Sequence, residues 1–217
     1  ELFRVLPEDN RVIGFGILAL ALAVKVLDPG LIESLQLRTF DLMQKLKPRE
    51  RGALPVAIID IDEKSLAELG QWPWPRTVMG EVIERAMADG VAAIALDIVF
   101  AEPDRMSPAL YAAGARGLSA ASREELSKLP GNDEALAAVL KRSRVVLGQS
   151  GLPMAAASTA SPGRQTPVAT IGGDPRPFLI GYAGLLANVP VLEAAASGSG
   201  LFSIRNEFDG IVRRVGL

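Results

Sequence analysis

Val56–Arg76 reads VAIIDIDEKSLAELGQWPWPR, and a related pattern, AAIALDIVF, follows at Ala92–Phe100. Each stretch opens with an apolar run and then reaches aspartate. Short apolar runs bounded by helix or turn signals are typical of buried parallel strands. Thr77–Asp89 lies between the two stretches and spaces its apolar residues as an amphipathic helix does. The order strand, helix, strand predicts a right-handed βαβ unit.

Three aspartates are expected at one edge of this unit. Asp60 and Asp62 are two residues apart, so they point to the same side of their predicted strand, and Asp97 belongs to the next one. Open α/β sheets bind ligands at the carboxyl ends of parallel strands. The three acids therefore predict a site for an ion or a cationic small molecule, with Asp60 and Asp97 as ligands of a divalent cation. The identity of the ligand, and of any cofactor, does not follow from the residues.

Each acid also has a simpler interpretation. Asp62 can cap the helix predicted at Glu63–Leu69, because the first turn of a helix needs a side-chain acceptor. Asp97, buried by its neighbours, can accept backbone N–H groups or pair with an arginine. Asp60 is the hardest of the three to explain by folding alone.

A stiff corner follows, because the sequence Trp72-Pro73-Trp74-Pro75-Arg76 contains two prolines that fix φ and disfavour helix before them. Indole rings can line a ligand pocket or stack on a cation, which makes Trp72, Trp74 and Arg76 candidate ligand contacts. The favoured alternative is structural: the indoles plug the end of the sheet while Arg76 neutralises an aspartate below. The two roles are compatible.

The run IDEKSLAELGQWPWPR, then a helix, then ALDIVFAEPD resembles the CHASE2 family of extracytoplasmic sensory domains. GLFSIRNEFDGIVRR at Gly200–Arg214 is similar to that family's closing strand, Asp-Gly turn and Arg-Arg strand. The resemblance covers roughly Leu35 to Val215. It implies a ligand-sensing domain of a bacterial receptor, held at the inner membrane on its periplasmic or extracellular side. It also implies a nucleotide cyclase or protein kinase output outside this chain, and no catalytic role for this segment.

The amino-acid composition excludes several classes of function and of site. The 217 residues carry a formal charge of −2, so a nucleic acid is not an expected partner. The chain has neither Cys nor His, which excludes disulfides, thiol nucleophiles, zinc fingers and His-based catalytic triads. We expect a membrane anchor in residues 1–29, an amphipathic linker helix in 30–50 and the sensor domain in 51–217.

The expected anchor is Val12–Val24, which is uncharged and apolar and continues past Lys25 to Leu27, about 16 residues in all. Roughly 20 are needed to cross a bilayer, although a lysine near one end can snorkel. A buried core helix is the alternative. The resemblance, rather than the charge rule, places the domain outside the cytoplasm, since basic residues flank the anchor on both sides: Arg4 and Arg11 before it, and Arg38, Lys45 and Lys47 after it.

The linker helix is expected at Leu31–Leu46, where apolar residues repeat on one stripe until Pro48 ends the pattern. The stripe predicts packing either on the domain itself or on a second copy, so a homodimer is expected. A purely structural dimerisation module is therefore one alternative function.

An enzyme is the other alternative. AIIDIDEKS also resembles the opening of haloacid-dehalogenase-type phosphatases, in which an apolar strand leads to D-x-D and binds Mg²⁺. Asp60 would be the nucleophile and Asp62 the acid/base. The match stops there, because neither the later lysine nor the paired acids of that family is evident.

The rest of the chain predicts a mixed, partly parallel sheet flanked by helices. Near its end, Arg213 and Arg214 point to opposite faces of a strand, and the inward one is expected to pair with Asp97 or Asp60. The predicted elements are a helix in the 101–131 excursion with a Ser122/Glu125 capping box, a helix at 133–141 capped by Asn132, a helix at 190–196, strands at 144–149, 178–182, 200–204 and 211–215, and a loop over 151–177.

Overall fold

The computed structural model forms two compact units, residues 1–60 and residues 61–217, which are described separately. The residues it describes are 8–27, 29–48, 50, 52, 55–153, 171–174, 177, 179, 181–204, 207 and 209–213.

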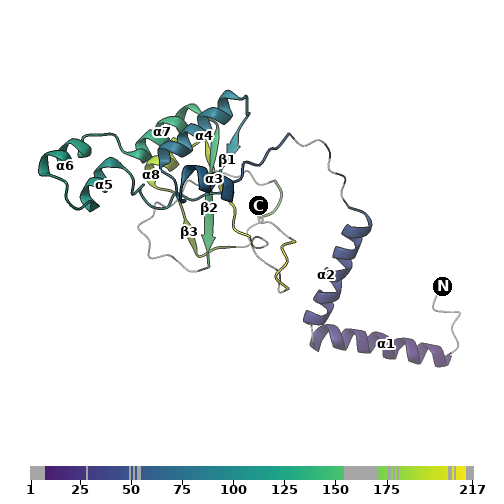
Figure 1. Ribbon diagram of the computed structural model, residues 1–217. Coiled ribbons are helices and arrows are strands. Elements are labelled where there is room, and N and C mark those ends of the chain that lie inside the picture. Colours follow the sequence, from purple (N-terminus) through teal and green to yellow (C-terminus); the bar gives the residue numbers. More distant parts are fainter. Residues whose placement is uncertain are drawn as a thin grey trace. The chain divides into compact units, whose positions relative to one another are not determined.

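The described residues of the first unit form two helices, α1 (Glu8–Leu27) and α2 (Pro29–Leu46) (Figure 1). The described helices include none that alone is long and apolar enough to cross a bilayer. Val12–Leu27 and Ile32–Leu46 together meet the length and composition required, with a bend of 97° between them. Helix α2 covers the range predicted for the linker helix, and its role as a linker between anchor and sensor stays a prediction.

The first predicted strand is wrong. Residues 55–62 belong to no helix or strand, and the side chains of Val56, Ile58 and Ile59 are 75%, 91% and 69% exposed. Strand propensity largely expresses how well side chains pack against neighbours on a sheet, so an apolar run does not by itself secure a paired strand.

The sheet of the second unit is centred on β2 (Val145–Leu152). The strands β1 (Ile94–Ala95) and β4 (Gly198–Leu201) pair with it in parallel, and β3 (Gly184–Leu186) pairs with it antiparallel. The predicted mixed, partly parallel sheet is therefore confirmed. The register places Ile94 opposite Val145, Val146 opposite Gly198, and Ser150 opposite Leu186.

Helix α7 (Asn132–Arg142) packs against both α4 (Arg76–Ala88) and α8 (Pro190–Ala195), which lie beside the sheet in Figure 1. Contact with α4 is close because Gly80 has no side chain: a Cβ there would lie 3.3 Å from a methyl carbon of Val139. The largest fully buried apolar side chains are Ile83, Phe100, Leu136, Leu140, Val145, Leu147 and Leu192.

The excursion between β1 and α7 forms a helical arm. Its two helices, α5 (Pro108–Gly114) and α6 (Ala120–Ser127), pack on each other and extend away from the sheet (Figure 1). The guanidinium of Arg123 donates to the carbonyl oxygens of Ala112 and Ala115, which ties α6 to the end of α5.

Two predicted helix starts are wrong. The cap of α6 is Ser119, whose Oγ accepts the N–H of Ser122 at 3.0 Å, so the Ser122/Glu125 capping box is not formed. Asn132 is the first residue of α7 and not its cap, because its side-chain amide donates to a different partner, Asp104. A polar residue at a helix start can cap the helix or hydrogen-bond to a distant residue, and the tertiary structure determines which of the two it does.

The predicted strand boundaries also shift. The strand predicted at 92–100 is reduced to β1, and the one at 144–149 extends to Leu152 in β2. The strand expected at 178–182 is replaced by β3, with 178 and 180 outside the described residues. Most of the loop predicted at 151–177 also lies outside them, and so does Arg214.

The Asp-Gly turn near the end of the chain is confirmed. The N–H of Glu207 donates to the carbonyl of Ile211 at 3.1 Å, and Gly210 adopts a φ of +78° that favours glycine. The flanking residues differ from the prediction, since β4 ends at Leu201 and residues 211–213 are not in a strand.

Candidate functional site

Asp62 caps α3 (Glu63–Leu69), which confirms the simpler interpretation of this acid. Its Oδ1 accepts the hydroxyl of Ser65 at 2.7 Å and the backbone N–H of Ser65 at 2.8 Å. These bonds, the hydroxyl first, lower the pKa of Asp62 below its ordinary value. The carboxylate is thus occupied by its own helix.

Asp60 and Asp97 are both exposed to solvent. Asp97 lies in the loop directly after β1, at the carboxyl end of that strand, and its predicted burial is wrong. No three acidic side chains within the described residues are grouped closely enough to hold a metal ion. A cation role for Asp60 and Asp97 therefore stays a prediction.

The tryptophan corner packs into the interior of the second unit. Trp74 is 5% exposed and belongs to the main core, and its indole N–H donates to the carbonyl oxygen of Gly70 at 2.8 Å. Trp72 is half-buried and meets Trp74 edge to face, with 5.6 Å between ring centroids. This is the structural role that the proline-flanked sequence suggested.

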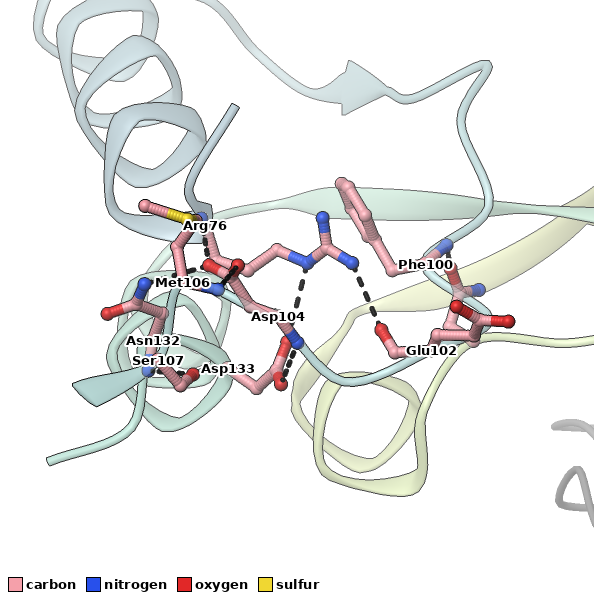
Figure 2. Close-up of polar contacts among 9 residues, drawn as sticks. Arg76, Phe100, Glu102, Asp104, Met106, Ser107, Asn132 and Asp133 are labelled. Carbon is pink, nitrogen blue, oxygen red and sulfur yellow. Dashed lines mark hydrogen bonds and ion pairs between the residues drawn. The ribbon is translucent and has the colours of Figure 1, made fainter. Parts of the chain in front are cut away.

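Arg76 does neutralise an aspartate, but one outside the predicted trio. Its Nε lies 3.3 Å from Oδ1 of Asp133, and both side chains are about nine-tenths buried. The guanidinium also donates to the carbonyl oxygen of Glu102 at 3.1 Å and stacks 4.3 Å from the ring centroid of Phe100 (Figure 2). A buried cation of this kind needs such partners.

Asp104 is the centre of the buried charge cluster around Arg76 (Figure 2). Its Oδ2 accepts the backbone N–H of Arg76 and the side-chain amide of Asn132, both at 2.8 Å, and its Oδ1 accepts the N–H of Met106 at 2.8 Å. Burial alone would raise the pKa of Asp104, but these hydrogen bonds outweigh it and lower the pKa. We call Arg76, Asp104, Ser107, Asn132 and Asp133 the Arg76 cluster.

The Arg76 cluster joins the two ends of the helical arm. Where the arm begins, Asp104 donates its N–H to Oδ2 of Asp133 at 2.8 Å. Where it ends, Asn132 donates its N–H to the hydroxyl of Ser107 at 3.0 Å. The first and last residues of the arm are therefore held together by one set of hydrogen bonds.

A second polar cluster is built around Glu193, which is 5% exposed. Its Oε1 accepts the side-chain amides of Asn188 at 2.9 Å and Gln149 at 3.0 Å, and its Oε2 accepts the hydroxyl of Ser199 at 2.8 Å. All these donors are uncharged. Burial alone would raise the pKa of Glu193, but the hydrogen bonds outweigh it and lower the pKa. We call these four residues the Glu193 cluster.

Asn188 connects the Glu193 cluster to the loop that follows β1. Its Oδ1 accepts the N–H of Phe100 at 2.7 Å, and its Nδ2 donates to the carbonyl oxygen of Gly148 at 3.0 Å. The guanidinium of Arg76 stacks on the ring of Phe100, so Phe100 contacts both the Arg76 cluster and the Glu193 cluster.

Arg213 was predicted to pair with Asp97 or Asp60. It pairs instead with Asp209 in the nearby turn. The pair is bidentate, with N–O distances of 2.9 and 2.8 Å. The hydrogen bonds from Arg213 lower the pKa of Asp209 to about 2. Sequence proximity explains the choice, since a partner four residues away costs little chain entropy.

Sequence reasoning missed the acids that are buried. Asp133 falls in the helix predicted at 133–141 and Asp104 in the 101–131 excursion, and neither was predicted to be buried. For the Glu193 cluster, the sequence did contain one signal of a buried polar site: Asn188 is a lone amide in the apolar run LLANVPVL. A polar residue inside such a run must find hydrogen-bond partners in the interior.

The CHASE2 domain family matches residues 15–217. The chain belongs to this family. CHASE2 domains are extracytoplasmic sensory domains of membrane receptors, so the chain has a sensory and not a catalytic role. No curated protein and no solved structure matches it.

Proposed function

We propose that this CHASE2 domain is tethered to the inner membrane by the apolar segment Val12–Leu27, binds a small molecule or an ion on the outer side of that membrane and controls an output domain elsewhere in the protein. The output is a nucleotide cyclase or a protein kinase. The family match over residues 15–217 carries the sensory part of the proposal. The ligand and the output rest on the residues discussed next and on family resemblance.

The proposed cation contacts are Asp60 and Asp97. Both carboxylates are exposed, and Asp97 stands at the carboxyl end of β1, where parallel sheets offer their ligand sites. Asp62 is a weaker candidate because its Oδ1 is occupied by Ser65. The same occupation argues against the phosphohydrolase alternative, which needs Asp62 as a free acid/base.

The remaining predicted ligand contacts are proposed to support the site indirectly. Trp74 and Arg76 are buried, and Arg213 is paired with Asp209. Trp72, half-buried beside Trp74, is the member of the corner best able to meet a ligand. A sensor must in addition bind its ligand unequally in two conformations, because equal binding shifts no equilibrium.

Isothermal titration of the full chain with Mg²⁺, Ca²⁺ and spermidine tests the acidic site. Binding heat is expected for the wild type and a reduced affinity for Asp60→Asn and for Asp97→Asn. Asp89→Asn is the matched control, since Asp89 is an exposed acid whose partner is Arg85 at 3.5 Å. Equal titrations for all four proteins would refute the site.

A homodimer is part of the same proposal. It rests on the apolar stripe in the sequence of Leu31–Leu46, whose exposed side chains a second copy or another apolar surface can cover. Sedimentation equilibrium of the full chain in detergent tests it, and a monomer mass throughout would contradict it.

A further inference from the structure

Helix α2 exposes its apolar face. Leu35, Leu42, Met43 and Leu46 are 59%, 52%, 57% and 70% exposed, and at 3.6 residues per turn they fall within about 100° of the helix circumference. Leu37 faces the opposite side and is 7% exposed. The more apolar side of the helix is therefore the uncovered one.

Basic side chains border this apolar face. Arg38 and Lys45 lie along one edge of it and Lys47 lies beyond the other, all exposed. The sequence from Lys45 to Arg51, KLKPRER, holds four basic residues against one acid. An apolar face with cationic borders is the pattern of helices that lie in a membrane interface and contact anionic headgroups.

The direction of α2 fits the same surface. Residues 12–24 of helix α1 are uncharged and apolar, and Ile13, Phe15, Leu18 and Leu22 are each at least 60% exposed. The bend between α1 and α2 is 97°. A helix perpendicular to one that enters a bilayer runs along the bilayer surface.

We infer that α2 is an interfacial membrane helix whose apolar face enters the boundary between headgroups and acyl chains. The inference rests on the proposed function, in which the chain is tethered to a membrane. About 16 apolar residues at 1.5 Å each reach roughly 24 Å, less than the roughly 30 Å of a hydrocarbon core. The face of α2 adds a second apolar contact to this short anchor.

A second copy fits the face of α2 less well. A coiled coil calls for heptads sustained over three to four repeats, whereas Ile32 to Leu46 spans about two. The central position of that seam is Thr39, whose hydroxyl already donates to the carbonyl oxygen of Leu35 at 2.7 Å. Lipid contact requires neither a longer repeat nor an apolar residue there.

The absence of cysteine allows a clean test with single-cysteine variants. Leu18→Cys reports on α1, Leu42→Cys on the apolar face of α2, and Gln44→Cys on its polar side. Each full-chain variant is labelled with the fluorophore NBD and reconstituted into vesicles of phosphatidylcholine and phosphatidylglycerol. Some of the vesicle lipids carry a nitroxide on the acyl chain, which quenches only labels that reach the membrane.

The labels at 18 and 42 are expected to be quenched at least about twofold more than the label at 44. A label at 42 quenched no more than the one at 44, with the label at 18 quenched, overturns the inference and leaves the membrane tether intact. If the label at 18 also stays unquenched, the tether of the proposed function fails as well. Copper-catalysed disulfide formation between unlabelled Leu42→Cys chains, without quenching at 42, would assign the face to a second copy and also overturn the inference.

Discussion

Asp104 caps helix α4 from 28 residues away, through a 2.8 Å hydrogen bond from the backbone N–H of Arg76 to its Oδ2. The cap residue of α4 in the sequence is Pro75, which has no side-chain acceptor. The carboxylate of Asp104 thus caps a helix and also accepts a hydrogen bond from Asn132, where the arm ends. This arrangement makes the Arg76 cluster a structural centre of the second unit.

Replacing this carboxylate is expected to be costly. Asp104→Ala removes the cap of α4 and leaves the N–H of Met106 and the amide of Asn132 without their acceptor. The free energy of unfolding is expected to fall by about 2–3 kcal/mol, measured by urea denaturation. Glu124→Ala is the control, because its ion pair with Lys128 is exposed, and about 0.5 kcal/mol or less is expected. Similar losses for the two variants would contradict this role of Asp104.

Asn188→Asp is expected to destabilise the domain more than Asn188→Ala at pH 7. The aspartate would set a second carboxylate where Nδ2 now donates to Glu193 at 2.9 Å, whereas alanine only removes hydrogen bonds. Urea denaturation is expected to show a difference of about 1 kcal/mol or more that closes at pH 4, where one of the two acids takes up a proton. The hypothesis fails if alanine is the worse substitution at neutral pH.

Acid is expected to destabilise the domain through its buried carboxylates. The pKa values of Asp104 and Glu193 are lowered in the folded state, so the unfolded chain binds protons at a higher pH than the folded one. The stability they add is present above their unfolded pKa values, about 4, and is lost as pH falls through the folded ones. At pH values below about 4, the urea concentration at the unfolding midpoint is expected to decrease. The difference in unfolding free energy between wild type and Glu193→Gln is expected to shrink over the same pH range. A gap of constant size from pH 7 to pH 2.5 would show that the charge of Glu193 is not what stabilises the fold.

Gly148 permits a close approach at the centre of the sheet. A Cβ at this position would lie 2.5 Å from a ring carbon of Phe202 and 2.7 Å from the carbonyl oxygen of Leu96. Gly148→Ala is therefore expected to lower the free energy of unfolding by about 1–3 kcal/mol, in thermal or urea denaturation. Gly198→Ala is the matched control on the neighbouring strand, since its Cβ would meet Val146 at an ordinary 3.9 Å. Equal effects of the two substitutions would mean that the sheet relaxes freely around residue 148.

Local patterns in the sequence predicted where several of the helices lie. The stripe at Thr77–Asp89 became α4, and the Asp62 cap and Gly70 end of α3 follow directly from side-chain and backbone chemistry. The family resemblance is carried by WPWPR and the Asp-Gly turn and agrees with the family match. These features depend on residues a few positions apart, so local chemistry is sufficient to specify them.

Pairing over long distances was decided only by the tertiary structure. The sequence determined that Val56–Ile59 is apolar, but not whether a neighbouring strand would accept it, and the run remains exposed. It likewise determined which residues are acids, but not that Asp104 and Asp133 would be buried with Arg76. A charge inside a protein is stable only beside partners that complete its hydrogen bonds, and partners 28 or more residues away come together only when the chain folds.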